Sequence, residues 1–400
     1  MRSAKPWTRL GTLTALLSAT ALAAACGSSG SGSSGGAEDI VLGANVEVSG
    51  SGAAIGQQWQ RGIELAVDKA NGDQGFLVNG KRYRWKLDLK DNKTLPDQAI
   101  ANNRAFAGEK AKFILGPGVS TAFVPAMNAL GNGDRIVMTP SVAAAQFIGK
   151  SDGNNLFITH LSDTGDNGRV AKMVQTLESN YHAKRVAVLL PQDDAGELYT
   201  KAFTQYFTAA GAEVVYAKAF PGDTRDFSSY ITALKGVNPD LVVSGYLDTW
   251  MRPFLEQSAG AGFTSPVFVG APGTNVTSLG QVGASIQNFA WSVTTRAVDN
   301  ATDPAVQPYR TAYRAKYGND PGADGFWGLS YYDPILMMTK AMQDAGTVDN
   351  PKSISDAMLK VTQWPDAVLA EHFDPAKRQA VYTPQIGFYA AGKITYVEAK

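Results

Sequence analysis

Small and hydroxyl-bearing residues gather at two points where a predicted strand gives way to a predicted helix. Gly116 to Thr121 reads Gly-Pro-Gly-Val-Ser-Thr after the apolar run 113–115, and Thr139 to Ala145 reads Thr-Pro-Ser-Val-Ala-Ala-Ala after the next strand. A hydroxyl at either point could simply cap its helix. Open α/β sheets, however, bind ligands at the carboxyl ends of their strands, where helix N-termini present N–H groups. The pattern therefore favours a ligand-binding edge.

A glycine-rich loop, Gly50 to Gly56, also follows a predicted strand and opens a helix. It is one residue longer than the dinucleotide-binding fingerprint, and the acids that could bind a ribose, Asp88 and Asp91, come too far along the chain. We therefore reject a dinucleotide site. Small residues at a helix N-terminus still predict open N–H groups that could hold a carboxylate or another anion.

Acidic and aromatic residues follow two later predicted strands, which end near positions 190 and 244. They are Asp193, Asp194, Glu197, Tyr246 and Asp248. Acids in these positions most often cap the next helix and complement its dipole. Because they also follow strand ends, they are the second group of candidate ligand contacts.

Residue types needed for hydrolysis or for a metal centre are scarce in the sequence. The folded part contains no Gly-x-Ser-x-Gly nucleophile motif. The single cysteine, Cys26, rules out an intramolecular disulfide and a thiolate cluster. No two of the three histidines have metal-ligand spacing. We expect His160, at the end of a strand-like stretch, to be structural, His182 to end a helix and His372 to lie in a loop. The sequence thus predicts a protein without catalysis, metal or cofactor.

Composition excludes other classes of function. The 400 residues contain 36 Lys and Arg against 36 Asp and Glu, so no basic field exists to hold nucleic acid. A hydrophobic fraction of 44% and a charged fraction of 18% are ordinary for a globular chain. The length suggests two or three domains.

The N-terminus has the pattern of an export signal. Basic residues precede an uncharged, mostly apolar run over 10–25, which is shorter than the roughly 20 residues of a spanning helix. Cys26 follows in a stretch that resembles a bacterial lipobox, although Ala23 stands where leucine is usual. Ordinary secretory cleavage is the alternative. We expect a signal peptide over 1–25, then a lipidated Cys26 and a flexible Gly/Ser tether over 26–37.

Strand-like and helix-like patterns alternate along the rest of the chain. The predicted strands are 40–48, 83–89, 113–115, 135–138, 186–190, 214–216, 241–244, 267–269, 289–293, 385–389 and 394–397. The predicted helices are 55–70, 96–107, 121–130, 166–181, 197–210, 227–235, 250–261, 304–317, 324–345 and 353–359. This alternation predicts an α/β fold with parallel sheets covered by helices on both faces. The number of units is enough for two doubly wound sheets.

Short motifs in a fixed order connect the chain to a known family. They are 48–56, 61–67, Asp91-Asn92 with Pro96, Gly116-Pro117 with Ser120, Thr139-Pro140-Ser141, Asp193-Asp194 with Gly196, 239–242 and Tyr332-Asp333. Because of these motifs and their order, the segment from about Asp39 to Glu398 resembles the leucine/isoleucine/valine-binding family. Its members are the type I periplasmic binding proteins of ABC importers.

The resemblance implies two α/β lobes, joined by three crossings near His160, Val293 and Pro384, with the ligand between them. Lobe 1 would comprise 38–158 and 293–383, and lobe 2 would comprise 159–292 and 384–400. In the family, hydroxyl and N–H groups of the first lobe hold the ligand carboxylate, and closure of the second lobe completes the site. Carried over, the carboxylate contacts are Ser120, Ser141 and Ala143. The full expected ligand-binding set is Ser49, Ile55, Ser120, Thr121, Ser141, Val142, Ala143, Asp194, Tyr246, Asp248 and Pro272.

Two positions depart from the family pattern. Ala195 stands where an aromatic residue is frequent, and Pro272 stands where amino-acid binders have an acid for the ligand ammonium. An ammonium buried without a partner is strongly unfavourable. Either Asp194 or Asp248 supplies the charge, or the ligand is not an α-amino acid.

The sequence as a whole predicts an extracytoplasmic solute-binding lipoprotein of an ABC importer, held at the membrane by Cys26. Its partners would be a small polar solute and the permease of the cytoplasmic membrane. The solute would be a branched-chain or other amino acid, or a related carboxylate or amide. The alternatives are a ligand sensor for a membrane receptor and, less favoured, an exported enzyme on the same fold.

Overall fold

The computed structural model describes residues 36–150, 153–160, 168–244, 248–269, 288–293, 304, 306–319, 327–364, 368–390 and 393–399. Cys26, Tyr246 and Pro272, three of the residues singled out above, lie outside these ranges. Residues 36–400 form one compact unit, distinct from 1–35. None of the helices in the described ranges has the length and apolar character needed to cross a membrane.

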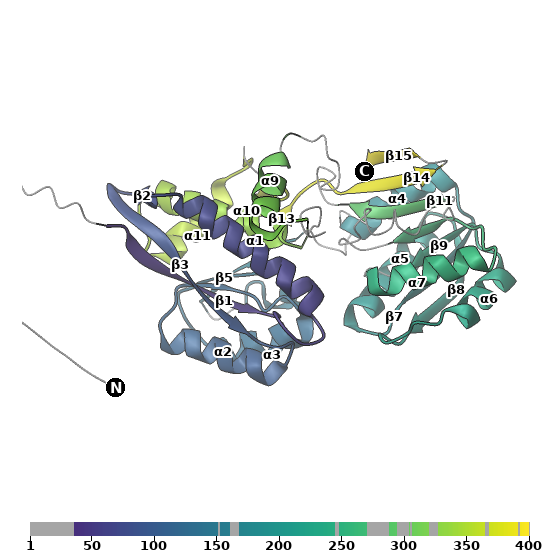
Figure 1. Cartoon of the computed structure of the whole chain (residues 1–400), viewed down its shortest axis with the longest axis horizontal. Coiled ribbons are helices and arrows are strands. Elements are labelled where there is room, and N and C mark those ends of the chain that lie inside the picture. The colour runs from purple at the N-terminus through teal and green to yellow at the C-terminus, as the bar shows by residue number, and fades with distance from the viewer. Residues whose placement is uncertain are drawn as a thin grey trace, which may run out of the picture. The chain divides into compact units, whose positions relative to one another are not determined.

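The first sheet has six strands in the order β2-β3-β1-β4-β5-β6 (Figure 1). Every pair is parallel except β2 with β3. The strands are β1 Glu38–Val46, β2 Phe76–Val78, β3 Lys81–Asp91, β4 Phe113–Leu115, β5 Ile136–Thr139 and β6 Asn155–Ile158. Helices α1 Ala53–Asn71, α10 Leu329–Ala345 and α11 Pro351–Lys360 lie on one face, and α2 Pro96–Gly108 and α3 Ser120–Leu130 lie on the other.

Burial on both faces explains why the central strands are continuously apolar. Successive side chains of a strand point to opposite faces. In β4, Phe113 and Leu115 belong to the core under α1 and α10, whereas Ile114 belongs to the core under α2 and α3. Helix α9, Gln307–Tyr317, adds Tyr309 and Tyr313 to the first of these cores. A chain segment beyond residue 300 thus completes the layer that the first 160 residues begin.

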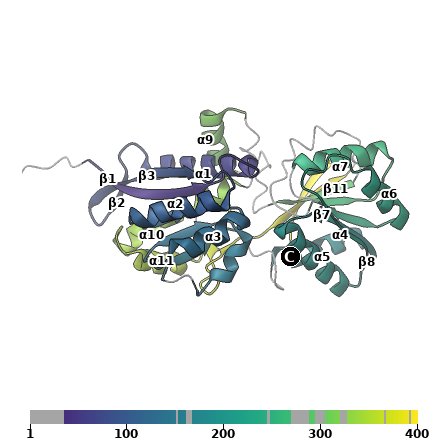
Figure 2. The same cartoon turned by 90° about the horizontal axis from the view of Figure 1, so that it is seen from below.

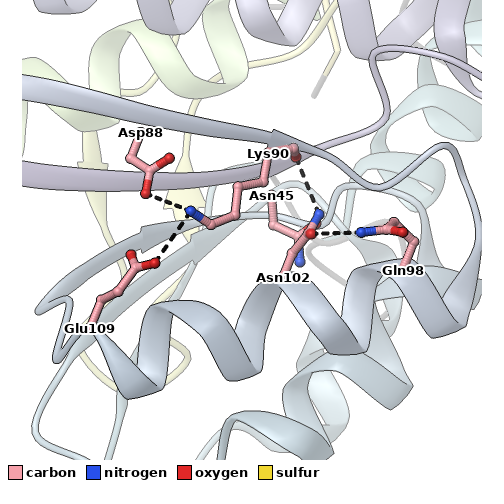
Figure 3. A network of polar contacts seen from close by, with 6 residues as sticks. All are labelled: Asn45, Asp88, Lys90, Gln98, Asn102 and Glu109. Atoms are coloured by element: carbon pink, nitrogen blue, oxygen red, sulfur yellow. Dashed lines mark hydrogen bonds and ion pairs between the residues drawn. The ribbon is translucent and has the colours of Figure 1, made fainter.

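Helix α2 is fastened to the sheet by buried amides. The Asn45 side chain on β1 donates to the Ala99 carbonyl and to Asn103 Oδ1, at 2.9 and 2.8 Å. Figure 3 shows Asn102 placed between Asn45, Gln98 and the Lys90 carbonyl. Because buried polar groups need partners, this network fixes one register of α2 on β1 and β3.

The second sheet has seven strands in the order β15-β14-β11-β10-β9-β7-β8. They are β7 Arg185–Pro191, β8 Glu213–Phe220, β9 Leu241–Ser244, β10 Val267–Val269, β11 Asn288–Val293, β14 Gln385–Ala390 and β15 Lys393–Glu398. The strands from β8 to β11 are parallel, and β14 and β15 are antiparallel. Helices α4 Arg169–Tyr181 and α5 Asp194–Ala209 cover one face, and α6 Ser228–Val237 and α7 Asp248–Gly260 cover the other (Figure 2). This sheet has its own hydrophobic core.

The predicted α/β class with mostly parallel sheets is therefore confirmed. Three short strands were not among the predicted elements: β2, β12 (His372–Phe373) and β13 (Ala380–Val381). Strand β6 lies in the strand-like stretch expected before His160. His372 was expected in a loop, but it lies in β12, His372–Phe373, which pairs with β13, Ala380–Val381. The pairing buries Phe373 against Phe157 of β6, with ring centroids 5.0 Å apart. This contact explains why His372 and Phe373 form a strand and not a loop. The boundaries assigned to the two lobes remain a prediction.

Candidate functional site

Two serine hydroxyls meet at the carboxyl edge of the first sheet. Ser120 is the first residue of α3, and Ser141 precedes the short 3-10 helix η1, Val142–Phe147. Their Oγ atoms are 3.1 Å apart, and Ser141 is only 1% exposed. They meet because β4 and β5, which lead into the two loops, are parallel neighbours. Two adjacent hydroxyls can donate to the two oxygens of one carboxylate.

Four backbone N–H groups accompany the hydroxyl pair. Ala122 and Phe123 donate to the Val119 carbonyl, and Ala144 donates to the Ser141 carbonyl. The N–H groups one and two positions earlier in each helix have no acceptor within the described ranges. They belong to Ser120, Thr121, Val142 and Ala143. The first N–H groups of a helix lack intrahelical acceptors, and together with the hydroxyls they suit an anionic ligand. The structure thus brings five of the predicted contacts to one place: Ser120, Thr121, Ser141, Val142 and Ala143.

The loops that carry these groups are held by side-chain bonds and close packing. Thr139 Oγ1 donates to the Pro117 carbonyl at 2.6 Å and accepts from the Ser141 N–H at 3.0 Å. At Gly118, a Cβ would lie 2.2 Å from the Trp59 ring. Only glycine permits this approach, so the α3 N-terminus rests directly on an aromatic ring of α1.

A buried carboxylate that the sequence analysis missed lies behind this edge. Glu47 follows β1 and is fully buried, and its oxygens accept from the N–H groups of Gly118 and Val119 at 3.1 to 3.3 Å. Burial raises the pKa of Glu47 from its ordinary 4.5 to about 7; the Val119 and Gly118 N–H groups and the Asn92 amide act in the opposite direction without offsetting it. Glu47 therefore changes charge near neutral pH.

The glycine-rich loop uses part of the N–H groups that were expected to be open for an anion, and an anion contact there stays a prediction. The Gly52 N–H donates to Thr94 Oγ1 at 2.9 Å, and the Ala53 N–H donates to the Gly50 carbonyl. The N–H groups of Ile55 and Gly56 both donate to the Gly52 carbonyl. Thr94 thus caps the start of α1 from a distant turn, whereas the N–H groups of Ser51 and Ala54 have no acceptor in the described part of the chain.

Ser49 and Ile55, the two candidate contacts near this loop, have different environments. The Ser49 hydroxyl donates to Asp91 Oδ2 at 2.6 Å, and its N–H donates to Asp91 Oδ1. Burial acts to raise the pKa of Asp91, but the hydrogen bonds from Ser49 and Lys93 outweigh it and lower that pKa. Ile55 is half-buried against the core under α1. Neither residue forms a hydrogen bond with Ser120 or Ser141.

The acids of the second sheet occupy helix starts. Asp193 caps α5 and accepts from the Gly196 N–H at 2.7 Å, as the capping interpretation predicts. Asp194 and Asp248 are the first residues of α5 and α7, and these helices follow the parallel strands β7 and β9. His160 is buried. Within the described part of the chain, no cluster of His, Cys, Asp or Glu could hold a metal ion.

Comparisons with known proteins agree on one family. The family described as periplasmic binding protein matches residues 39–387. The Leu/Ile/Val-binding protein BraC3 of Rhizobium johnstonii is 26% identical over 335 residues, which cover 82% of this chain and 86% of that protein.

Solved structures share the fold. The branched-chain amino acid transporter substrate-binding protein LivJ of Streptococcus pneumoniae, in complex with isoleucine, has a TM-score of 0.71 at 23% identity, covering 90% of this chain and 100% of that one. An ABC transporter solute-binding protein of Rhodopseudomonas palustris, in complex with 3,4-dihydroxybenzoic acid, has a TM-score of 0.72 at 20% identity, covering 90% and 98%.

These findings confirm the family resemblance that the sequence motifs indicate. The match covers the first sheet from residue 39 and the second sheet up to residue 387, within β14. The chain belongs to the periplasmic binding protein family and is an extracytoplasmic-type binding protein, not an enzyme.

Proposed function

We propose that this chain is the solute-binding lipoprotein of an ABC importer, and that it captures a small carboxylate-bearing solute. The observation that carries the proposal is the Ser120–Ser141 hydroxyl pair, surrounded by open N–H groups at the edge of the first sheet. Isoleucine and 3,4-dihydroxybenzoic acid, the ligands of two structural relatives, differ in charge and shape. They share a carboxylate, which is the group these donors suit.

The ligand would lie between two lobes, with lobe 1 comprising 38–158 and 293–383. The first lobe would hold the carboxylate, and closure of the second lobe would add contacts from the loops around Asp194, Tyr246, Asp248 and Pro272. The relatives' names favour a branched-chain amino acid. Pro272, at the position where an acid is expected, favours a carboxylate without an ammonium. An amide-type solute is the remaining outcome.

Three matched ligands separate these possibilities. Isoleucine carries both groups, isoleucinamide lacks the carboxylate, and 3-methyl-2-oxopentanoate lacks the ammonium. Residues 36–400 are screened with each by thermal shift and calorimetry. A ligand at 100 times its Kd stabilises a protein by about 2.7 kcal/mol. We expect stabilisation by the oxo acid, by isoleucine only if Asp194 or Asp248 pairs with its ammonium, and none by isoleucinamide. Stabilisation by isoleucinamide alone would refute the carboxylate site.

The site itself is tested with Ser120→Ala combined with Ser141→Ala. A hydrogen bond to a charged group contributes about 1.5 kcal/mol or more, so the double variant is expected to bind the preferred carboxylate about 100-fold more weakly. Ser228→Ala is the matched control, because Ser228 also begins a helix, α6, but lies in the second sheet's layer. Equal binding by the double variant and the control would show that the ligand lies elsewhere.

A sensor role, in which ligand occupancy is passed to a membrane receptor, is the second candidate. It would use the same ligand site, so the ligand experiments above do not exclude it. Uptake of the ligand in cells that lack the gene for this chain separates the two roles, because an importer component is required for uptake and a sensor is not.

A further inference from the structure

The buried side chain of Glu47 lies at the N-terminus of α3. Its carboxylate takes the N–H groups of Gly118 and Val119. The next two N–H groups along the chain, those of Ser120 and Thr121, are the open ones at the proposed ligand site. One helix terminus therefore faces an internal carboxylate and, on the proposed function, also the carboxylate of the ligand.

Two negative charges at one helix terminus oppose each other. A helix N-terminus carries a partial positive charge that stabilises one anion, and the effect is confined to the first turn. Two carboxylates that share a buried site disfavour double ionisation, and the pKa of one of them rises. A ligand carboxylate at Ser120 and Ser141 would therefore favour the protonated form of Glu47.

Among the residues that the structure describes, no Lys, Arg or His forms an ion pair with Glu47. At the end of β3, Lys90 is paired with Asp88 and Glu109, and Asp91 is bound by Ser49. The uncharged Asn92 is the β3-end residue that faces the carboxylate.

The helices packed against Glu47 add one titratable group. From α10, Tyr331 faces it: burial raises the pKa of this tyrosine well above its ordinary value, and the charge of Glu47 adds to the shift. Neither α1 nor α3 has an acid in its first turn. From α1, Gly56 approaches the Glu47 backbone so closely that a Cβ would lie 1.9 Å from its carbonyl oxygen. Among the described groups around it, Glu47 is thus the one suited to change charge near neutrality.

We propose that Glu47 couples ligand capture to a proton: a carboxylate ligand binds at Ser120 and Ser141 together with uptake of one proton by Glu47. The inference rests on the proposed function, since it needs a carboxylate at the serine pair. Glu47 acts here as a positioning residue. It is fully buried and reaches the ligand only through the helix terminus that both share.

Calorimetry of residues 36–400 tests the coupling, with benzoate and 3-methyl-2-oxopentanoate as probes between pH 6 and pH 8. Each titration is run in two buffers with different ionisation enthalpies, so that the protons taken up are counted. With a pKa near 7 for Glu47, we expect the association constant to fall by up to about 10-fold over this range, with uptake approaching one proton at pH 8.

Two variants locate the proton. Glu47→Gln keeps an oxygen that accepts from Gly118 and Val119 but cannot titrate, so we expect its affinity to be independent of pH, with no proton uptake. Asp333→Asn is the matched control. Asp333 is an equally buried acid of the same layer, with a pKa raised by burial to about 6, but it accepts from the N–H groups of 368–370. This control should retain the wild-type pH dependence of binding.

Three results would overturn the inference. Wild-type protein that binds a probe without proton uptake would refute the coupling and leave the proposed function standing. Proton uptake that persists in Glu47→Gln would assign the proton to another group. If neither carboxylate binds at any pH while isoleucinamide does, the proposed carboxylate site fails and the coupling fails with it. Should Glu47→Gln not fold, a lack of proton uptake by wild-type protein would still refute the coupling, and loss of the uptake in Asp333→Asn would assign the proton to Asp333.

Discussion

At the scale of single residues, Glu47 illustrates how burial overrides residue type. A single glutamate near the end of a predicted strand, as Glu47 is in 40–48, suggests a surface residue, since acids are rarely fully buried. Its burial depends on N–H donors 71 and 72 positions away, in Gly118 and Val119. No local pattern could reveal that pairing. The serine pair was different, because hydroxyls placed directly after neighbouring parallel strands must meet at one edge.

The raised pKa of Glu47 also predicts how folding stability depends on pH. Because the pKa is about 7 in the folded chain and about 4.5 otherwise, the native state binds more protons between these values. The free energy of unfolding must therefore fall as pH rises from 4.5 to 7, by on the order of 3 kcal/mol for this residue. Urea unfolding at several pH values, without ligand, measures it.

Glu47→Gln should flatten that profile only in part. Burial also raises the pKa of Asp333, to about 6, and this residue contributes in the same direction between its ordinary value and pH 6. The variant should thus lose the slope between pH 6 and pH 7 and keep part of the slope below pH 6. An unchanged profile in Glu47→Gln would mean that Glu47 does not titrate in the folded chain.

At the scale of elements, the sequence predicted the strands that are buried on both faces and the helices that have one buried face. Central strands such as β9 are continuous apolar runs because helices cover both faces. Strand β2, Phe76–Val78, was missed although β4 and β10 are equally short and were predicted. It is the edge strand of its sheet and pairs with β3 alone. Strands β12 and β13, which were also missed, have two residues each. Short strands gain their stability from partners, and their own pattern is too brief to show it.

The docking of α2 gives a prediction at this scale (Figure 3). Asn45→Ala removes a buried amide and leaves the Ala99 carbonyl and the Asn102 and Asn103 side chains without it. A buried polar group left without a hydrogen-bond partner costs about 1–3 kcal/mol. We therefore expect the free energy of unfolding of Asn45→Ala to be about 2–3 kcal/mol lower than that of the wild type. Unfolding in urea measures it.

Lys90→Met provides the comparison within the same network. Lys90 bridges Asp88 and Glu109, at 2.7 and 3.6 Å, but all three side chains are partly exposed. Exposed ion pairs contribute about 0–1 kcal/mol, and the substitution keeps the aliphatic stem. We expect a clearly smaller loss than for Asn45→Ala. Equal losses would show that the buried amides are not what fastens α2.

At the scale of the whole molecule, the chain returns to each sheet after leaving it. Residues 38–158 build the first sheet, 185–293 build most of the second, α9 to α11 pack on the first, and β14 and β15 close the second. Periodicity predicts each of these elements but not which sheet it joins, since an amphipathic helix fits either layer. That assignment came from the family resemblance, and the observed packing gives it a physical basis in two separate cores.

The link between this molecule and the membrane is the last prediction, and it concerns the N-terminus. An apolar run over 10–25 leads to Cys26, followed by a Gly/Ser-rich stretch. If Cys26 carries a diacylglyceryl group, two acyl chains anchor the protein stably, since each buried CH₂ contributes about 0.8 kcal/mol. The exported wild-type protein should then partition into the detergent phase of Triton X-114, and its mature N-terminal peptide should have the mass of a lipidated cysteine. Cys26→Ala should abolish that modification without changing ligand affinity, and Ser28→Ala, the nearby control, should behave as wild type. An unmodified N-terminus at another residue would establish ordinary secretory cleavage and leave the ligand site untouched.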